Sequence, residues 1–274
     1  MKARFLLGAL LLLVCSLTGC SDDENGNTPD VTPFSLEKTY YEVRLGPLST
    51  HINITNGSGD ISLAIANEAI IEAARVQNEG EDVFVSLYGK RKGNTTLTLT
   101  DNVTGDKETV EVKVTDCYLA YGIAGSNHPA LASNLMLYLV NNEARDCYFF
   151  TMDYMEHQLN NTPLAKGTYE FFVRQEGEKK TPYLRLNYPA DESGNLAQDA
   201  PMEAHDFALS FNDSQRVLDI IRTYLDVDWE ELISNPMTRD LPPVDLTMKM
   251  TVPGTDYEIT GVLATAPIPE GILD

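Results

Sequence analysis

Two neighbouring stretches decide the fold: Gly93-Asn-Thr-Thr-Leu-Thr-Leu-Thr-Asp101 and Thr109-Val-Glu-Val-Lys-Val114, with Gly105 between them. In both stretches apolar and polar residues alternate, and in an extended chain successive side chains point to opposite faces. Two such runs joined by a short connection that contains glycine predict a β-hairpin with one buried face.

The alternation continues outward from this hairpin, from Phe34 to about Asp116. Further short runs, such as Tyr41-Glu-Val-Arg-Leu45 and Val83-Phe-Val-Ser-Leu87, are separated by turn residues such as Asn56-Gly-Ser-Gly59. About seven short strands in ~80 residues is the size of an immunoglobulin-like sandwich.

A family resemblance rests on the same residues. A glycine-led strand that ends in Asp101, a turn with Gly105 and a closing Val-x-Val-x-Val strand resemble the bacterial Ig-like domains of group 2. The resemblance implies an Ig-like β-sandwich over residues 34–116. It also implies a strand at Ile70–Val76, although Ala, Glu and Arg in that segment are good helix formers.

Residues 117–274 differ in composition, because they hold 10 of the 13 tyrosines and the only tryptophan. Their alternating segments predict a second antiparallel β domain, which could be a sandwich, a jelly roll or a lipocalin-like barrel. Its clearest element is a closing hairpin, Val244–Val252 and Tyr257–Leu263. One inserted helix is expected near 214–234, since apolar residues there recur at helical spacing after Asp213 or Ser214 as the cap. The whole chain is thus expected to be mainly β.

The segment Leu164-Ala-Lys-Gly-Thr-Tyr-Glu-Phe171 and the closing hairpin are similar to a recurrent C-terminal β domain of Bacteroidetes surface lipoproteins. This resemblance implies a cell-surface protein and names no activity.

The N-terminus reads as an export signal. Lys2 and Arg4 precede the apolar run Phe5–Val14, which is shorter than the ~20 residues that span a bilayer. The run leads into Leu17-Thr-Gly-Cys20, which resembles the lipobox of bacterial lipoproteins. By that resemblance residues 1–19 are a signal peptide, and Cys20 carries a diacylglyceryl thioether and an N-acyl chain. Such chains hold a protein stably on a lipid bilayer.

Residues 20–33 form a lipidated acidic tether, in which four acidic residues occur without a base. Ser21-Asp-Asp-Glu24 also resembles the export signal of Bacteroidetes lipoproteins, which implies the outer membrane with the protein facing the exterior. The alternative is a tether that leaves the protein on the periplasmic face.

The formal charge of −21 excludes two classes of partner. Nucleic acids and anionic membrane surfaces both require clusters of Lys and Arg that neutralise phosphates. The expected bilayer contact is therefore the lipid at Cys20 and not a basic surface.

Two cysteines remain after the signal peptide and the lipidation site are accounted for. Cys117 and Cys147 could form a disulfide, worth ~4 kcal/mol if geometry permits, because the chain is exported. They could equally be two buried thiols on neighbouring strands that never meet.

No motif for catalysis, a metal or a cofactor assembles. None of the four histidines has the spacing of zinc ligands, and each is expected at the surface or in local hydrogen bonds. The weak calcium candidate Asp226, Asp228 and Glu230 lacks the glycine and the terminal glutamate of an EF-hand loop. A solvated face at the start of a helix is favoured instead, because acidic residues near a helix N-terminus interact favourably with its dipole. We therefore expect no enzyme and no cofactor.

The remaining signal is aromatic. Five side chains could offer flat faces to sugars, although core packing is the more common role: Tyr118, Tyr121, Tyr183, Tyr188 and Trp229. The leading hypothesis is a non-catalytic surface lipoprotein whose C-terminal β domain binds a glycan or a surface protein. The alternative hypothesis is a structural or assembly subunit of a cell-surface complex.

Overall fold

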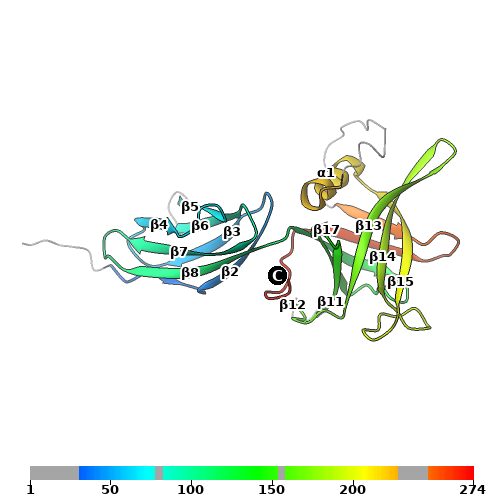
Figure 1. Ribbon diagram of the computed structural model, residues 1–274, viewed down its shortest axis with the longest axis horizontal. Helices are drawn as coiled ribbons and strands as arrows, with labels where there is room; N and C mark the ends of the chain where they lie inside the picture. Colours follow the sequence, from blue (N-terminus) through cyan, green and yellow to red (C-terminus); the bar gives the residue numbers. More distant parts are fainter. Residues whose placement is uncertain (1–30, 78–82, 154–157, 228–245) are drawn as a thin grey trace, which may run out of the picture. The chain divides into compact units, whose positions relative to one another are not determined.

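The computed structural model describes residues 31–77, 83–153, 158–227 and 246–274 (Figure 1). Within these residues the chain is mainly β, as the alternation predicted, with one helix. Residues from Thr32 onward form one compact unit. No helix of the described residues is long and apolar enough to cross a membrane.

The first module is a sandwich of two four-stranded sheets. One sheet has the order β1 (Ser35–Leu36), β3 (Thr50–Thr55), β6 (Val83–Gly89), β5 (Ile71–Gln77). The other has the order β2 (Tyr40–Arg44), β8 (Lys107–Thr115), β7 (Gly93–Asp101), β4 (Ile61–Ile65). The first order matches the ABED sheet of an immunoglobulin fold, and the second adds an edge strand parallel to the last strand of the CFG sheet.

The hairpin that was expected to decide the fold is present as β7 and β8. Leu97 pairs with Val110, and both point into a core made by the inner faces of the two sheets. The segment for which a helix was the competing interpretation is strand β5, so the strand prediction is confirmed. Asp101 ends β7 with a fully buried carboxylate that accepts hydrogen bonds from the backbone and hydroxyl of Ser58, at 2.7 and 2.6 Å.

The second module is a closed eight-stranded barrel. Of the sandwich, the jelly roll and the lipocalin-like barrel that the sequence left open, the structure has the barrel. Each barrel strand pairs antiparallel with the next along the chain, and the last pairs with the first. The strands are β9 (Tyr118–Ser126), β10 (Leu135–Val140), β11 (Asp146–Asp153), β13 (Ala165–Glu176), β14 (Lys179–Pro189), β15 (Met202–Phe211), β16 (Thr247–Thr251) and β17 (Glu258–Ala264). The two-residue strand β12 (Gln158–Leu159) pairs with β11 at the side.

Closure depends on Gly261, where the pairing of β17 with β9 shifts register. A Cβ atom at this position would lie 2.3 Å from the carbonyl oxygen of Gly122 and 2.6 Å from the Tyr121 ring. The Tyr121 hydroxyl donates a 2.7 Å hydrogen bond to the carbonyl oxygen of Met248, which ties β9 to β16 across the interior. Without a side chain at Gly261, β17 can approach β9 and Tyr121 closely enough to pair.

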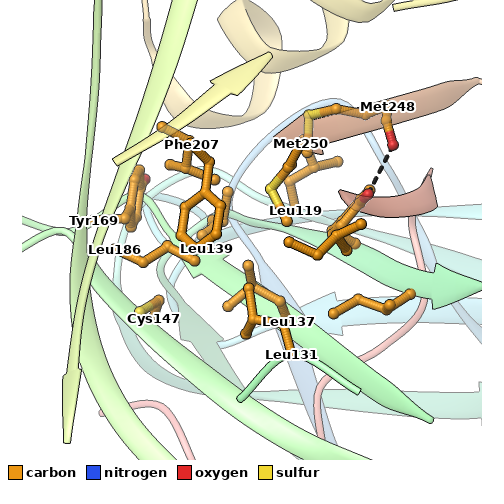
Figure 2. Packing of buried hydrophobic residues seen from close by; sticks show 14 of the residues in the cluster. Leu119, Leu131, Leu137, Leu139, Cys147, Tyr169, Leu186, Phe207, Met248 and Met250 are labelled. Carbon is orange, nitrogen blue, oxygen red and sulfur yellow. Dashed lines mark hydrogen bonds between the residues drawn. The ribbon is translucent and has the colours of Figure 1, made fainter. Parts of the chain in front are cut away.

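The barrel interior is occupied by side chains. Figure 2 shows Leu119, Leu137, Leu186, Phe207 and Met250 converging from different strands, and all five belong to one buried cluster. A barrel of eight strands has an interior just wide enough for side chains to fill, so this packing is the expected result.

The single described helix, α1 (Ser214–Leu225), lies between β15 and β16. Asp213 caps its N-terminus by accepting a hydrogen bond from the backbone of Arg216, which confirms one of the two predicted caps. Val217, Ile221 and Leu225 are fully buried in the barrel cluster. The predicted continuation of the helix beyond residue 227 lies outside the described residues.

The C-terminal residues cover the outer face of the first barrel strands. Ile268 and Leu273 pack on Tyr118, Tyr138 and other outward residues of β9, β10 and β11. The Tyr138 hydroxyl donates to the carbonyl oxygen of Pro267, and the Tyr118 hydroxyl accepts from the backbone of Ile268. This part of the barrel surface is therefore a second, small core.

Candidate functional site

The two remaining cysteines are free thiols, both buried in the barrel cluster. Cys147 on β11 and Leu119 on β9 both pair with Leu139 of β10, so one strand separates the cysteines. Two inter-strand spacings amount to about 9.6 Å, beyond the ~7 Å between Cα atoms that a disulfide can span. The structure therefore has two buried thiols and no disulfide between Cys117 and Cys147. Burial raises the pKa of both thiols and keeps them protonated.

The tyrosines considered as sugar platforms are buried. Tyr121 and Tyr188 are 0% exposed inside the barrel, and Tyr118 is 7% exposed beneath the C-terminal residues. Tyr183 lies on the outer face at 7% exposure, where it stacks on Phe172 and the Arg174 guanidinium lies 4.6 Å from its ring centre. These four rings are packing residues and offer no open face to a ligand. Trp229 lies outside the described residues.

The described part of the chain does not form the weak calcium site that three acidic residues suggested. Asp226 is the C-cap residue of α1 in a left-handed conformation, while Asp228 and Glu230 lie outside the described residues. Among the residues that are described, no group of three or more His, Cys, Asp and Glu side chains could hold a metal ion.

A histidine cluster lies at the barrel end where β9 stops and β15 starts. His128, in the loop after β9, is 8% exposed, and its Nδ1 accepts hydrogen bonds from the backbone of Ala130 and Leu131 at 3.2 and 3.3 Å. This local bonding is one of the two environments expected for histidines. Its ring lies 6.4 Å from the ring of His205 and 5.2 Å from that of Tyr257, measured between centres.

The electrostatics of this cluster favour neutral rings. Burial, and secondarily the neighbouring His205, lower the pKa of His128 to about 4. Burial also lowers the pKa of His205, although Glu203 and Asp206 oppose that change. Because Nδ1 of His128 accepts two backbone bonds, the proton of its neutral ring is on Nε2. The cluster thus holds the loop after β9 against the barrel end, with Leu131 fully buried.

An open groove of about 700 Å³ lies on the first module, over the outer face of the sheet that contains β7 and β8. Pairing places Tyr40, Glu111 and Thr96 in one row across β2, β8 and β7, with Lys113 and Asn94 in the next row. The residues after β4 close one side. The full lining is Tyr40, Ala66, Asn67, Asn94, Thr95, Thr96, Glu111, Val112 and Lys113.

Some side chains of the groove are already engaged in hydrogen bonds, and others form none with the described residues. The Tyr40 hydroxyl donates a 2.8 Å hydrogen bond to Glu42, and the Lys113 ammonium donates a 2.7 Å bond to the carbonyl oxygen of Leu273. Asn94, Thr96 and Glu111, in contrast, form no side-chain hydrogen bond or ion pair with any other described residue. Free amide, hydroxyl and carboxylate groups in one groove can bind a ligand by directional hydrogen bonds.

The sequence interpretation missed this groove because it searched for aromatic residues in the second module. The signal was present in the strand alternation, which places Asn94, Thr96, Glu111 and Lys113 on the outer face of the predicted hairpin. What the alternation could not supply is the concave shape, which depends on the turn after β4.

No protein-family model and no curated protein matches the chain. Among solved structures, the chain is similar to the S-layer protein rSbsC at 12% identity, with a TM-score of 0.28 and coverage of 65% of this chain and 24% of that chain. A structure of domains 5–6 of the S-layer protein SbsC is similar at 12% identity and a TM-score of 0.27, with coverage of 65% and 96%. The chain thus spans about a quarter of the length of the first of these proteins, and likeness at this level indicates no function.

Proposed function

We propose that the protein is a non-catalytic lipoprotein of the outer membrane, facing the exterior, whose β domains bind a glycan or a surface protein. The lipobox-like segment ending in Cys20 and the acidic segment after it support the anchor and the address. The observation that carries the binding function is the open groove, in which three polar side chains have no side-chain partner among the described residues.

The filled barrel adds to this proposal. Its interior residues form one buried cluster, and its tyrosines are occupied in packing. The barrel interior is thereby filled, and binding by the described residues is best supported on the outer surface of the first module. The strongly acidic chain keeps the protein soluble and repels it from an anionic membrane surface, which leaves the lipid as the attachment.

The anchor is tested by changing Cys20→Ser in a tagged full-length chain. The unchanged chain is expected to fractionate with outer membranes and to be digested when intact cells are treated with protease. The variant is expected to lose the membrane association. Equal membrane retention of both chains would refute the lipid anchor, and protection from protease in intact cells would place the protein on the periplasmic face.

The binding function is tested with the lipid-free chain of residues 21–274 on a glycan array, and by co-purification from gently solubilised membranes. Glycan binding supports the glycan form of the proposal. A blank array together with a stoichiometric membrane partner would favour the alternative, an assembly subunit of a surface complex. A blank array and no partner would refute binding altogether.

A further inference from the structure

We propose that the groove of the first module is a binding site for a neutral, hydroxyl-rich glycan, with Asn94, Thr96 and Glu111 as its hydrogen-bonding side chains and Tyr40 as its aromatic wall. This inference rests on the proposed binding function and assigns it to a site and to a class of ligand.

The size of the groove suits a small oligosaccharide. Ligand sites in proteins measure about 300–1,000 Å³, and the groove of about 700 Å³ falls inside this range. Its two rows of residues extend across three strands, and neighbouring strands lie about 4.8 Å apart. An extended ligand could therefore contact all three strands at once.

The free side chains of the groove lie close together on the outer face of the sheet. Next to the groove, the hydroxyls of Thr98 and Thr109 bond to each other at 3.1 Å, and Ser62 donates a 2.9 Å bond to Asn102. Farther along the same face, Thr100 and Lys107 form no side-chain hydrogen bond with a described residue, so pairing varies over this face. In the groove three such groups, those of Asn94, Thr96 and Glu111, lie in adjacent rows with no side-chain partner among the residues that the structure describes.

These three groups match the hydroxyls of a sugar. The Asn94 amide donates and accepts, the Thr96 hydroxyl does both, and the Glu111 carboxylate accepts. A sugar hydroxyl is also both donor and acceptor, so adjacent hydroxyls can bond to a side-chain amide and a carboxylate together. Hydrogen bonds to the charged Glu111 are the stronger ones.

The aromatic wall is already in place before a ligand arrives. Tyr40 is half-buried, and the hydrogen bond from its hydroxyl to Glu42 holds its ring. Burial, with this hydrogen bond as the second cause, raises the pKa of Tyr40 to about 12, so the phenol remains a donor. A held side chain loses little entropy on binding, which favours affinity.

Charge argues for a neutral ligand. The groove lining carries one carboxylate, Glu111, and one ammonium, Lys113, and the latter is engaged by the Leu273 carbonyl. The chain as a whole has a formal charge of −21, which repels anionic glycans at long range. Uronic-acid and sulfated glycans are therefore disfavoured relative to neutral ones.

The experiment compares the lipid-free chain of residues 21–274 with the variants Asn94→Ala and Glu111→Gln on an array of neutral and acidic glycans. The dissociation constant for the best ligand is then measured by titration calorimetry. Asn94→Ala removes one hydrogen-bonding group, whereas Glu111→Gln removes the charge and replaces one acceptor oxygen by a donor. Each variant is expected to weaken binding about tenfold. Glu108→Gln is the matched control, because Glu108 is an exposed glutamate on the same strand outside the groove, and it is expected to bind as the unchanged chain does.

The outcomes separate this inference from the proposed function. Binding of a neutral glycan that both groove variants weaken and the control does not would support the site. Glycan binding that the groove variants leave unchanged would overturn the site while the proposed function stands. A preference for acidic glycans would overturn the ligand class, and a blank array would overturn the inference together with the glycan form of the function. Circular dichroism of each variant establishes that a loss of binding is not a loss of folding.

Discussion

Acidification from pH 7 to pH 5 is expected to weaken the folded barrel through His128. In the folded chain the Nδ1 atom of this residue accepts hydrogen bonds from the backbone of Ala130 and Leu131, and its ring packs on Phe207 and Tyr257. A proton on Nδ1 would face two backbone N–H donors and would place a charge in a mostly apolar site. Both effects oppose the protonated ring.

The magnitude follows from the difference between the folded and unfolded chain. Burial, and secondarily His205, lower the pKa of His128 from 6.5 to about 4 in the folded chain. Between pH 6.5 and pH 4 the unfolded chain binds more protons than the folded chain. The free energy of unfolding therefore decreases as the pH falls below 6.5, and the decrease is complete below about pH 4. The full loss is ~3 kcal/mol, of which ~2 kcal/mol is expected by pH 5. Burial lowers the pKa of His205 as well, so this residue acts in the same direction.

The assay is urea unfolding followed by far-ultraviolet circular dichroism, for the unchanged chain and for His128→Asn. The Asn side-chain oxygen can accept bonds from the following backbone amides, as in an Asx turn, but it does not titrate. Carboxylates titrate in both chains and cancel in the comparison. The unchanged chain should lose ~2 kcal/mol more than the variant between pH 7 and pH 5.

His51→Asn is the control, because His51 is exposed and bonds only to Ser49 at its ring nitrogen among the described residues. This control should follow the unchanged chain at every pH. If the unchanged chain and His128→Asn lose the same free energy between pH 7 and pH 5, the assignment of the pH dependence to His128 is refuted. Amide hydrogen exchange gives a local check, since the Ala130 and Leu131 amides should lose protection first.

Three further outcomes are expected. Both Cys117 and Cys147 should resist a thiol reagent in the folded chain and react after denaturation without reductant; one or no reactive thiol after denaturation would contradict the free pair. Gly261→Ala should lower the free energy of unfolding by about 1–3 kcal/mol because its Cβ atom would overlap backbone, whereas Gly125→Ala, with open space around the new atom, should unfold at nearly the same urea concentration. Asp101→Asn should reduce the acid sensitivity of the first module. Hydrogen bonds, most strongly those from Ser58, lower the pKa of the Asp101 carboxyl to about 2. The carboxylate therefore stabilises the fold above pH 4, and this stabilisation is lost toward pH 2. An unchanged acid-unfolding midpoint would argue against that role.

The first module was predictable because its signal is local. Leu97 and Leu99 alternate with threonines, and Val110, Val112 and Val114 alternate with polar residues, so the buried face of the central hairpin can be read residue by residue. The strand at Ile71–Gln77 needed the family resemblance, because its residues have helix propensity and only pairing with β6 makes them extended.

The closed barrel was not predictable from alternation alone. Alternation identifies strands but not their partners, and closure pairs Leu263 with Tyr121, far apart in the chain. Whether a set of antiparallel strands forms a sandwich, a jelly roll or a barrel depends on such long-range pairs. Likewise, Tyr118 and Tyr138 are buried on an outer barrel face only because the C-terminal residues return to cover them.

The same limit explains why the tyrosines of the second module were considered as sugar platforms. Ten tyrosines after residue 116 suggested a binding surface, yet a barrel of eight strands requires large side chains to fill its interior, and Tyr121, Tyr169 and Tyr188 meet that demand. In the first module, Tyr41 enters the core and its neighbour Tyr40 lines the groove, as alternation requires. The feature on which the proposed binding site rests is instead a polar side chain on the outer face, such as that of Asn94 or Glu111, that has no side-chain partner among the described residues. Single-sequence patterns cannot distinguish such a residue from a solvated one, because the distinction depends on the neighbours that the fold brings to it.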